Sequence, residues 1–461
     1  MLFLNKKTAE TIPVTPLDKA DLQKWLKKQN RARRNWVAAT GFTAATGTLL
    51  ALPDKNGAVE RVLFGVPEDG TLYSYAALPA RLGKNAAGYY IDKNLNNADA
   101  TQICIGWALG CYRFDRYKKS GKAYAQLVWP ENADKKTVEA TTAAVALVRD
   151  LVNTPSNDMG PAELAAAAKK LAGAFKKTRV SVITGEELLK KNWPAVYEVG
   201  KGSPRKPRLI DLRWGDPKHP RVTLVGKGVC FDSGGLDIKP ESAMLTMKKD
   251  MAGAAHVFGL ARMIMAHNLP VNLRVLVPAV ENATDGNSYR PGDIIKTRKG
   301  LTIEIGNTDA EGRLILADAL EEASRENPAL IVDFATLTGA ARVALGPDLP
   351  ALFCNDDATA EALLSSGQRV GDPLWRLPLW QPYALFLDSK IADCNNVGPN
   401  SFAGASVAAL FLEKFVSKGI PWAHIDTFAW NPSAKPGRPA GGEALGMRAA
   451  FDMIRKKFGR K

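Results

Sequence analysis

Histidine and cysteine are both scarce in this chain of 461 residues. The four histidines form no HExxH motif, so the sequence does not encode a histidine-ligated zinc site, and each histidine is expected to be structural. The five cysteines are odd in number and include no CxxC pair, which indicates free thiols in a reducing compartment. For Cys104 and Cys111, whose neighbours are apolar, core packing is the expected role.

Long hydrophobic runs are missing as well. The stretch that comes nearest to a membrane or targeting segment is the uncharged Trp36–Pro53, which contains four threonines. Its hydropathy is weak for a membrane span, and it begins too late for an ordinary signal peptide. We therefore expect no membrane anchor, a cytoplasmic location, and a place for this stretch inside a folded N-terminal domain.

Positive charge is in excess, with a formal net charge of +15 and a pI near 9.5. Such a surface attracts polyanions, which leaves nonspecific nucleic-acid binding open. However, the chain has no helix-turn-helix pattern and no basic motif interleaved with aromatic residues. Because the lysines are scattered, a solvated basic surface is the simpler expectation.

The most informative stretch is the acidic segment Asn307–Leu314. In an extended backbone the side chains of Asp309, Glu311 and Arg313 would share one face, just before a run of helix-forming residues. A simple alternative is that Asp309 caps this helix and Arg313 neutralises it. From its residue type alone, Arg313 would be assigned to a substrate carboxylate.

A second cluster upstream favours a functional site over a helix cap. Arg221–Val225 is typical of a short buried strand, and the four glycines between residues 226 and 235 allow the backbone to turn sharply at the carboxyl end of that strand, near Asp232. Asp250 comes shortly before another helix-forming run. If Asp232 and Asp250 join Asp309 and Glu311, four carboxylates meet, and their repulsion requires cations. Two divalent ions about 3.5 to 4 Å apart are the simplest solution.

These motifs resemble the leucyl aminopeptidases, the dinuclear-zinc cytosol aminopeptidases. The resemblance rests on Gly226-Lys227-Gly228, Phe231–Gly235, Ile238-Lys239-Pro240, Asp250-Met251 and Asn307–Leu314, and it extends over roughly residues 140–461. One departure is Ala252-Gly253 where the family usually has two glycines; a methyl group should fit at a helix start.

The resemblance implies a role for each motif residue. Five residues would hold two Zn²⁺ or Mn²⁺ ions: Lys227, Asp232, Asp250, Asp309 and Glu311. Lys227 would bind as a neutral amine, which requires cations and burial to lower its pKa. Lys239 would be catalytic, polarising the scissile carbonyl and stabilising the oxyanion, and Arg313 would hold a bicarbonate that acts as general base toward the metal-bridging water.

Further residues are implied on the substrate side: Met247, Thr336, Leu337 and Gly339. Met247 would line the pocket for the first side chain, although ordinary core packing is an equal alternative. The segment around Thr336 would contact the peptide through its backbone, with the Leu337 carbonyl and the Gly339 amide as candidates. The family assembles as hexamers, so the resemblance also implies a homo-hexamer.

The function implied is removal of the N-terminal residue, leucine-like by preference, from peptides. Two rival classes remain. A phosphoesterase could use the same carboxylates and two metals, and activity on an aminoacyl anilide against a phosphomonoester would separate the two. A DNA-binding regulator with a secondary peptidase site would require a sequence-specific footprint and a steep dependence on salt.

The chain is too long for one ordinary core and divides into three parts. We expect an N-terminal α/β domain of unknown role over residues 1–130, a connecting helix and linker over 131–157, and the catalytic domain over 158–461. Strand and helix patterns alternate in the last part, which predicts a mostly parallel central sheet flanked by helices. The predicted fold class is therefore α/β, with a smaller N-terminal domain and a larger catalytic domain.

Overall fold

The computed structural model describes residues 2–67, 70, 72–82, 87–119, 121 and 123–459. The chain forms two compact units. Unit 1 contains residues 1–142 and 433–440, and unit 2 contains residues 143–432 and 441–461. The outermost limits of the predicted domains, residues 1 and 461, lie outside the described residues.

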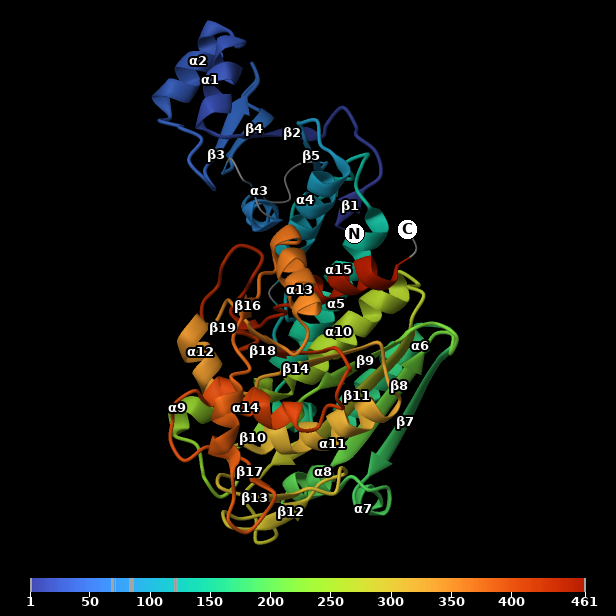
Figure 1. Ribbon diagram of the computed structural model, residues 1–461. Coiled ribbons are helices and arrows are strands. Elements are labelled where there is room, and N and C mark those ends of the chain that lie inside the picture. The colour runs from blue at the N-terminus through green and yellow to red at the C-terminus, as the bar shows by residue number, and fades with distance from the viewer. Residues whose placement is uncertain are drawn as a thin grey trace. The chain divides into compact units, whose positions relative to one another are not determined.

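Unit 1 is built on a six-stranded sheet. Its strands follow the order β1 (Phe3–Leu4), β6 (Leu127–Val128), β5 (Tyr89–Ile91), β2 (Ile12–Leu17), β4 (Val59–Gly65) and β3 (Leu49–Pro53) (Figure 1). Its helical segments are α1 (Lys19–Lys27), α2 (Arg31–Ala39), η1 (Leu72–Tyr75), α3 (Leu78–Leu82) and α4 (Asn97–Gly110). All neighbouring strands are parallel except the β3–β4 hairpin, whose turn contains Gly57 at φ +85°.

A late segment of the chain completes unit 1. Residues 433–440 belong to it although they follow nearly all of unit 2 in sequence. Gly437 has φ +68° and lies so close to Ala76 that a Cβ at this position would be 2.6 Å from the alanine methyl. The Arg438 guanidinium lies 5.7 Å from the centre of the Tyr73 ring. No sequence pattern predicted this return.

The predicted connecting helix is confirmed as α5 (Lys135–Asn153), and the boundary between the units falls inside it. Threonine is accommodated within this helix, because the Thr142 hydroxyl donates to the Val138 carbonyl at 2.8 Å. The short helix η2 (Ser156–Asp158) follows, after Pro155. Proline cannot continue the helical hydrogen-bond pattern, which explains the end of α5.

Unit 2 contains a nine-stranded sheet. The order is β16 (Trp375–Arg376), β15 (Ala351–Cys354), β18 (Trp422–Asp426), β14 (Leu330–Ala335), β9 (Arg221–Gly226), β11 (Asn272–Asn282), β8 (Arg208–Trp214) and β7 (Thr178–Thr184), and β10 (Gly228–Asp232) also pairs with β11. Strands β18, β14, β9 and β11 run parallel. Strand β15 pairs antiparallel with β18 and parallel with β16, and β8 pairs antiparallel with both β11 and β7. The predicted α/β class with a mostly parallel sheet is confirmed.

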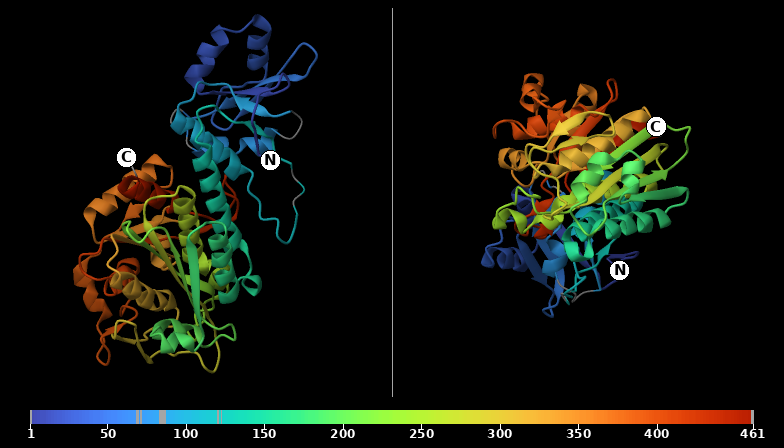
Figure 2. Two further views of the ribbon diagram at one scale, coloured as in Figure 1. Left: turned by 90° about the vertical axis from the view of Figure 1, so that its right-hand side faces the viewer. Right: turned by 90° about the horizontal axis from the view of Figure 1, so that it is seen from below.

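Helices cover both faces of this sheet. Helices α6 and α10 pack on one face, and α8 and α11 pack on the other (Figures 1 and 2). The helices of unit 2 are α6 (Pro161–Gly173), α7 (Glu187–Lys190), α8 (Pro194–Gly200), α9 (Glu241–Met244), α10 (Ala252–Ala266), α11 (Glu311–Arg325), α12 (Gly339–Leu345), α13 (Asp357–Arg369), α14 (Gly404–Glu413) and α15 (Met447–Phe458). Short segments complete it: η3 (Met247–Met251), η4 (Gln381–Leu387), β12 (Ile294–Lys296), β13 (Thr302–Glu304), β17 (Cys394–Asn395), β19 (Trp430–Asn431) and β20 (Gly441–Gly442).

Two local predictions were wrong, the first only in part. The backbone was expected to turn through the four glycines after β9, but Gly228–Asp232 is strand β10, and Gly228 pairs with Ala279 of β11. A Cβ on Gly226 would lie 2.7 Å from the Gly253 carbonyl oxygen, and one on Gly228 would lie 2.5 Å from that of Pro278. These two glycines therefore allow close packing, and the turn comes later, at Gly234 and Gly235 with φ of +92° and +64°.

The second error concerns the backbone of the acidic segment. An extended backbone was expected for Asp309 to Arg313, but α11 begins at Glu311, so Glu311 and Arg313 lie in its first turn while Asp309 lies in the preceding turn. Among the described residues, no helix combines the length and apolar character needed to cross a membrane.

Candidate metal centre

The carboxyl ends of neighbouring strands bring the predicted metal ligands together. Lys227 follows β9, Asp232 ends β10, and Asp250 lies in η3. Glu311 begins α11, and Asp309 precedes it by two residues. One oxygen each from Asp232, Asp309 and Glu311 lies within 4.8 Å of the others. Strand ends of this kind are where open α/β sheets bind ligands.

Two lysines link the four carboxylates. The Lys227 ammonium lies 2.7 Å from Asp250 Oδ2 and 2.8 Å from Glu311 Oε1. The Lys239 ammonium lies 2.7 Å from Asp232 Oδ2 and 2.5 Å from Asp309 Oδ1. Four carboxylates thus share two cations, which leaves the cluster with excess negative charge.

The pKa values reflect this imbalance. Burial, and then repulsion by Asp232, raise the pKa of both Glu311 and Asp309 above the usual carboxyl range. Burial alone would lower the pKa of Lys227 and of Lys239, but the surrounding carboxylates outweigh it and hold both values above the ordinary lysine range. The protein's own charges therefore favour additional positive charge at the site.

The donor set fits divalent cations. Glu311 is 1% exposed, and its Oε2 has no hydrogen-bond donor among the residues that the structure describes. The same holds for Oδ1 of the buried Asn282. Hard cations take carboxylate and amide oxygens as ligands, and buried carboxylate oxygens of this kind need a partner. Within the described chain, the site residues thus offer oxygens that a metal would satisfy.

The two lysines differ in accessibility. The Lys227 side chain is 3% exposed and that of Lys239 is 12% exposed. Lys227 is also enclosed by α11, because a Cβ on Gly312 would lie 2.6 Å from Lys227 Cε. The Lys227 amine accordingly faces the carboxylates, and it donates to the Thr336 carbonyl at 3.2 Å. The side chain of Lys239 is the more exposed of the two. The low pKa expected for Lys227 depends on bound cations and remains a prediction.

Glycine also allows α10 to approach the centre. A Cβ on Gly253 would lie 2.1 Å from the Phe334 carbonyl oxygen and 2.7 Å from the Lys227 amide nitrogen. The preceding Ala252 is buried as the first residue of α10. Its methyl group fits at the helix start, as expected from the sequence, whereas a side chain at Gly253 would not.

Sequence reasoning missed the residues that orient the carboxylates. The Asn282 side-chain amide donates to Asp232 Oδ1 at 2.8 Å and to the Thr308 carbonyl at 3.0 Å. The Tyr289 hydroxyl donates to the same carbonyl at 2.6 Å, and the Thr308 amide donates to Asp237 at 2.7 Å. The sequence offered one clue to Asn282: it is a polar residue at the end of a strand, and the carboxyl end of that strand faces the metal centre.

Arg313 is buried beside the acidic cluster. Its Nη1 donates to the Asn396 carbonyl at 2.6 Å, whereas its Nε has no acceptor in the described part of the chain. Burial lowers the pKa of this guanidinium to about 10, although Glu311 and Asp426 oppose the shift. The side chain thus retains donor capacity for an anion.

The predicted substrate-binding residues lie on two elements. Thr336 and Leu337 follow β14, and Gly339 is the exposed first residue of α12. The Thr336 hydroxyl donates to Asp250 Oδ1 at 2.7 Å, so this side chain orients a predicted ligand. Met247 is buried in η3, three residues before Asp250.

Asp426 holds this segment in place and was not predicted. Its Oδ1 accepts from the amide of Leu337 at 2.9 Å, and its Oδ2 accepts from the Thr338 hydroxyl at 2.6 Å. Asp426 ends β18, which pairs with β14, so its position at a strand end was again the available signal.

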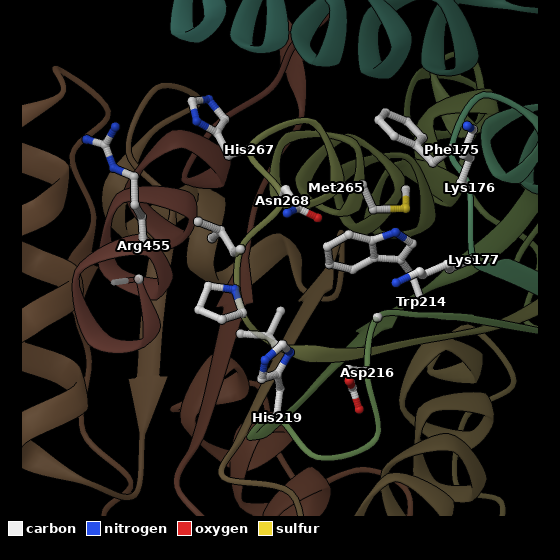
Figure 3. Close-up of a pocket in the computed structure, with 15 residues that line it drawn as sticks. Phe175, Lys176, Lys177, Trp214, Asp216, His219, Met265, His267, Asn268 and Arg455 are labelled. Carbon is white, nitrogen blue, oxygen red and sulfur yellow. The ribbon is translucent and has the colours of Figure 1, made fainter. Parts of the chain in front are cut away.

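A separate cavity of about 670 Å³ contains none of the predicted site residues. Its lining comes from the end of β8 and from the loops that lead into β9 and β11, which is the opposite end of these parallel strands from Lys227 and Asn282. Figure 3 shows Trp214 and Met265 within it, with His267 and Arg455 on one side and Phe175 and Lys176 on the other.

Comparisons with known proteins show which family the chain resembles in sequence. A model of the cytosol aminopeptidase family, catalytic domain, matches residues 146–451, and a model of the M17 aminopeptidase N-terminal domain matches residues 12–130. The chain is similar to a probable cytosol aminopeptidase of Syntrophotalea carbinolica, with 43% identity over 377 residues, 78% of this chain and 75% of the relative. A Brucella melitensis relative of the same description is 38% identical over 452 residues, 91% and 92% of the two chains.

Solved structures extend the similarity to the whole chain. The crystal structure of cytosol aminopeptidase from Coxiella burnetii matches with a TM-score of 0.95 and 49% identity, and the match covers 99% of each chain. The bottromycin maturation enzyme BotP in complex with Mn matches with a TM-score of 0.87 and 33% identity, over 97% of this chain and 100% of that chain.

Proposed function

Because the chain belongs to the cytosol aminopeptidase family, which are metallo-exopeptidases, we propose that it removes leucine-like residues from the N-termini of peptides with two divalent metals in this centre. The observation that carries the proposal is the convergence of four carboxylates on only two lysines, with Glu311 Oε2 left without a donor among the described residues. Such a cluster is suited to binding cations.

The metal ligands would be Lys227, Asp232, Asp250, Asp309 and Glu311. Bound there, a pair of Zn²⁺ or Mn²⁺ ions supplies Lewis acidity and an activated water. The solved structure of BotP contains Mn, which supports manganese as one candidate. The near-complete burial of Lys227 supports its assignment as a ligand, because desolvation favours the neutral amine once cations share the site.

Lys239 would act on the substrate. It is the more exposed of the two lysines, and its ammonium already contacts Asp232 and Asp309. In this role it donates to the scissile carbonyl oxygen and stabilises the negative charge that develops there. A single donor of this kind is worth about 10²- to 10³-fold in turnover.

Arg313 would hold a bicarbonate, the group that supplies a general base. Its buried Nε lacks an acceptor within the described residues, and a guanidinium can bind a planar oxyanion through two donors. The Asn396 carbonyl fixes the guanidinium from the other side.

The peptide would lie along residues 336–339. The Leu337 carbonyl and the Gly339 amide are the proposed backbone contacts, and the rigid hold of Asp426 on this segment supports that role. Met247 would line an apolar pocket for the first side chain. Such a pocket separates side chains by only about 1 to 3 kcal/mol per methylene, which fits a broad leucine-like preference.

A homo-hexamer is proposed for the assembly. Large apolar side chains are exposed on unit 2: Leu245 (84%), Val343 (81%), Phe402 (75%) and Leu385 (71%). Apolar side chains exposed to this degree support a contact with other copies of the chain where they lie in one patch. Light scattering coupled to size-exclusion chromatography would measure the mass, and a monodisperse monomer would contradict the proposal.

The function is tested by steady-state hydrolysis of a leucyl anilide with chelator, followed by addition of Mn²⁺, Zn²⁺ or Co²⁺. We expect activity to disappear with chelator and to return with metal. Full activity in a preparation that elemental analysis finds free of metal would overturn the proposal. Hydrolysis of a phosphomonoester in place of the anilide would favour the phosphoesterase class.

A further inference from the structure

Unit 1 contains a cavity of about 620 Å³ that the peptidase chemistry does not use. We name it the unit 1 crevice and define it by the segments after three strands: Asn5–Lys7 after β1, Lys93–Leu95 after β5, and Trp129–Asn132 after β6. These strands are adjacent and parallel, with Leu4 opposite Val128 and Tyr89 opposite Leu127. Their carboxyl ends therefore meet at one edge of the sheet, which is where parallel sheets bind ligands.

The charge in the crevice is positive. Lys6, Lys7 and Lys93 line it against a single carboxylate, that of Glu131. In the part of the chain that the structure describes, neither Lys6 nor Lys93 forms an ion pair. The neighbouring Asp92 pairs with Arg61 and does not neutralise them.

Aromatic and apolar groups also line the crevice, together with the polar side chains of Asn5, Asn94 and Asn132. Trp129 is half-buried and stacks on Phe3 with ring centres 3.9 Å apart. The Lys7 ammonium lies 3.8 Å from the centre of the Tyr90 ring, and Val128 is buried below. A ligand that combines negative charge with a flat apolar part fits this mixture.

The segments around the crevice are also fixed to one another. The Asn132 amide donates to the Leu95 carbonyl at 2.9 Å, and the Asn97 amide donates to the Asn132 carbonyl at 2.7 Å. These bonds join the segment after β5 to the segment after β6. A crevice that is ordered in advance loses less entropy when a ligand binds.

From these observations we propose that the unit 1 crevice binds a phosphate-bearing mononucleotide. Lysines are suited to phosphate as compact point charges. The volume is within the range of about 300 to 1,000 Å³ that is usual for small-ligand sites, and it exceeds what a lone phosphate needs. The site is independent of the peptidase proposal, since no residue of the metal centre contributes to it.

Isothermal titration of the metal-loaded, full-length protein with ADP tests the proposal. The test variant is Lys6→Glu/Lys93→Glu. The control is Lys19→Glu/Lys55→Glu, which reverses the charge of two exposed lysines of unit 1 that do not line the crevice. We expect the Kd for ADP to rise at least about tenfold in the test variant and to stay unchanged in the control. Leucyl-anilide activity and the melting temperature should be preserved in both, which shows that both fold.

Three results would overturn the proposal. The first is that ADP does not bind the unaltered protein, or that it binds the unaltered protein, the test variant and the control variant with equal affinity. Equal affinity would occur if ADP bound only at the metal centre. The second is equal affinity for inorganic pyrophosphate and ADP, which would reduce the crevice to a phosphate site. The third is loss of single-stranded DNA binding in the test variant without any ADP binding, which would assign the lysines to a nucleic-acid surface.

Discussion

Two clusters of charged side chains in unit 2 are balanced differently. The metal centre places Asp232, Asp250, Asp309 and Glu311 around Lys227 and Lys239. The arginine cluster, defined as Asp211, Arg274, Arg298, Glu322 and Glu326, joins strands β8 and β11 to helix α11. Arg274 Nη2 lies 2.8 Å from Asp211 and 2.9 Å from Glu322, and Arg298 Nη2 lies 2.5 Å from Glu322.

One glutamate from each cluster shows the difference, because the pKa values of Glu322 and Glu311 shift in opposite directions. Although burial raises it, the pKa of Glu322 is held below its ordinary value by Arg274 and Arg298. Burial, followed by Asp232, raises the pKa of Glu311 instead. Guanidinium groups offer planar pairs of donors that match carboxylates, whereas an ammonium is a single point of charge. A buried cluster that its own cations satisfy is structural, and one that they do not satisfy is suited to binding metal.

The largest effect that this comparison predicts is that of Glu311→Gln. We expect turnover on a leucyl anilide to fall about 10³-fold or more, because several kcal/mol of Lewis-acid stabilisation depend on the ligand, and metal content should fall with it. The matched control is Glu322→Gln in the arginine cluster, which should retain the metal. Normal metal content in Glu311→Gln, measured by elemental analysis, would contradict its assignment as a ligand.

The converse experiment removes a cation from the arginine cluster. Arg274→Met should lower the free energy of unfolding by about 3 to 5 kcal/mol, because it removes the buried guanidinium that Asp211, Glu322 and Glu326 share. Denaturant titration measures the loss, and kcat of the folded enzyme should stay close to normal. If unfolding were unaffected while turnover collapsed, the division into structural and metal-binding clusters would be wrong.

Lys239→Ala separates the two lysines of the metal centre. Turnover should fall about 10²- to 10³-fold, equivalent to about 2.7 to 4 kcal/mol of transition-state stabilisation. Metal content should persist, because the substitution removes a cation that competes with the metal for Asp232 and Asp309. Full turnover in this variant would show that its assigned role is wrong, and loss of metal would indicate a ligand instead.

The smallest expected effect comes from Gly312→Ala. Alanine suits a helix, but its methyl group would lie 2.6 Å from Lys227 Cε, so Lys227 must shift at a cost of about 1 to 3 kcal/mol. We expect weaker metal binding in chelator competition and a lower melting temperature. Gly173→Ala in α6 is the control, since nothing lies within 4 Å of that Cβ position. Equal behaviour of the two variants would refute the tight enclosure of Lys227.

The sequence predicted the fold class and the convergence of the acidic groups because the ligands sit in two compact motifs. The backbone conformation of these motifs and the hydrogen bonds around them could be predicted less well. The extended backbone expected at Glu311 is a helix, because the helix-forming run begins three residues earlier than its apolar part suggests. The roles of Asn282 and Asp426 depend on hydrogen bonds across tens of residues. No local pattern encodes such pairings, although both residues end strands.

The return of residues 433–440 affects how the protein is made. Gly437 packs against Ala76 and Leu109, so unit 1 lacks part of its structure until this segment has been synthesised. During translation, residues 1–142 leave the ribosome well before residues 433–440 are made. A polypeptide cut after residue 142 would therefore lack a segment of its own unit, and unit 1 is complete only after most of unit 2 has been synthesised.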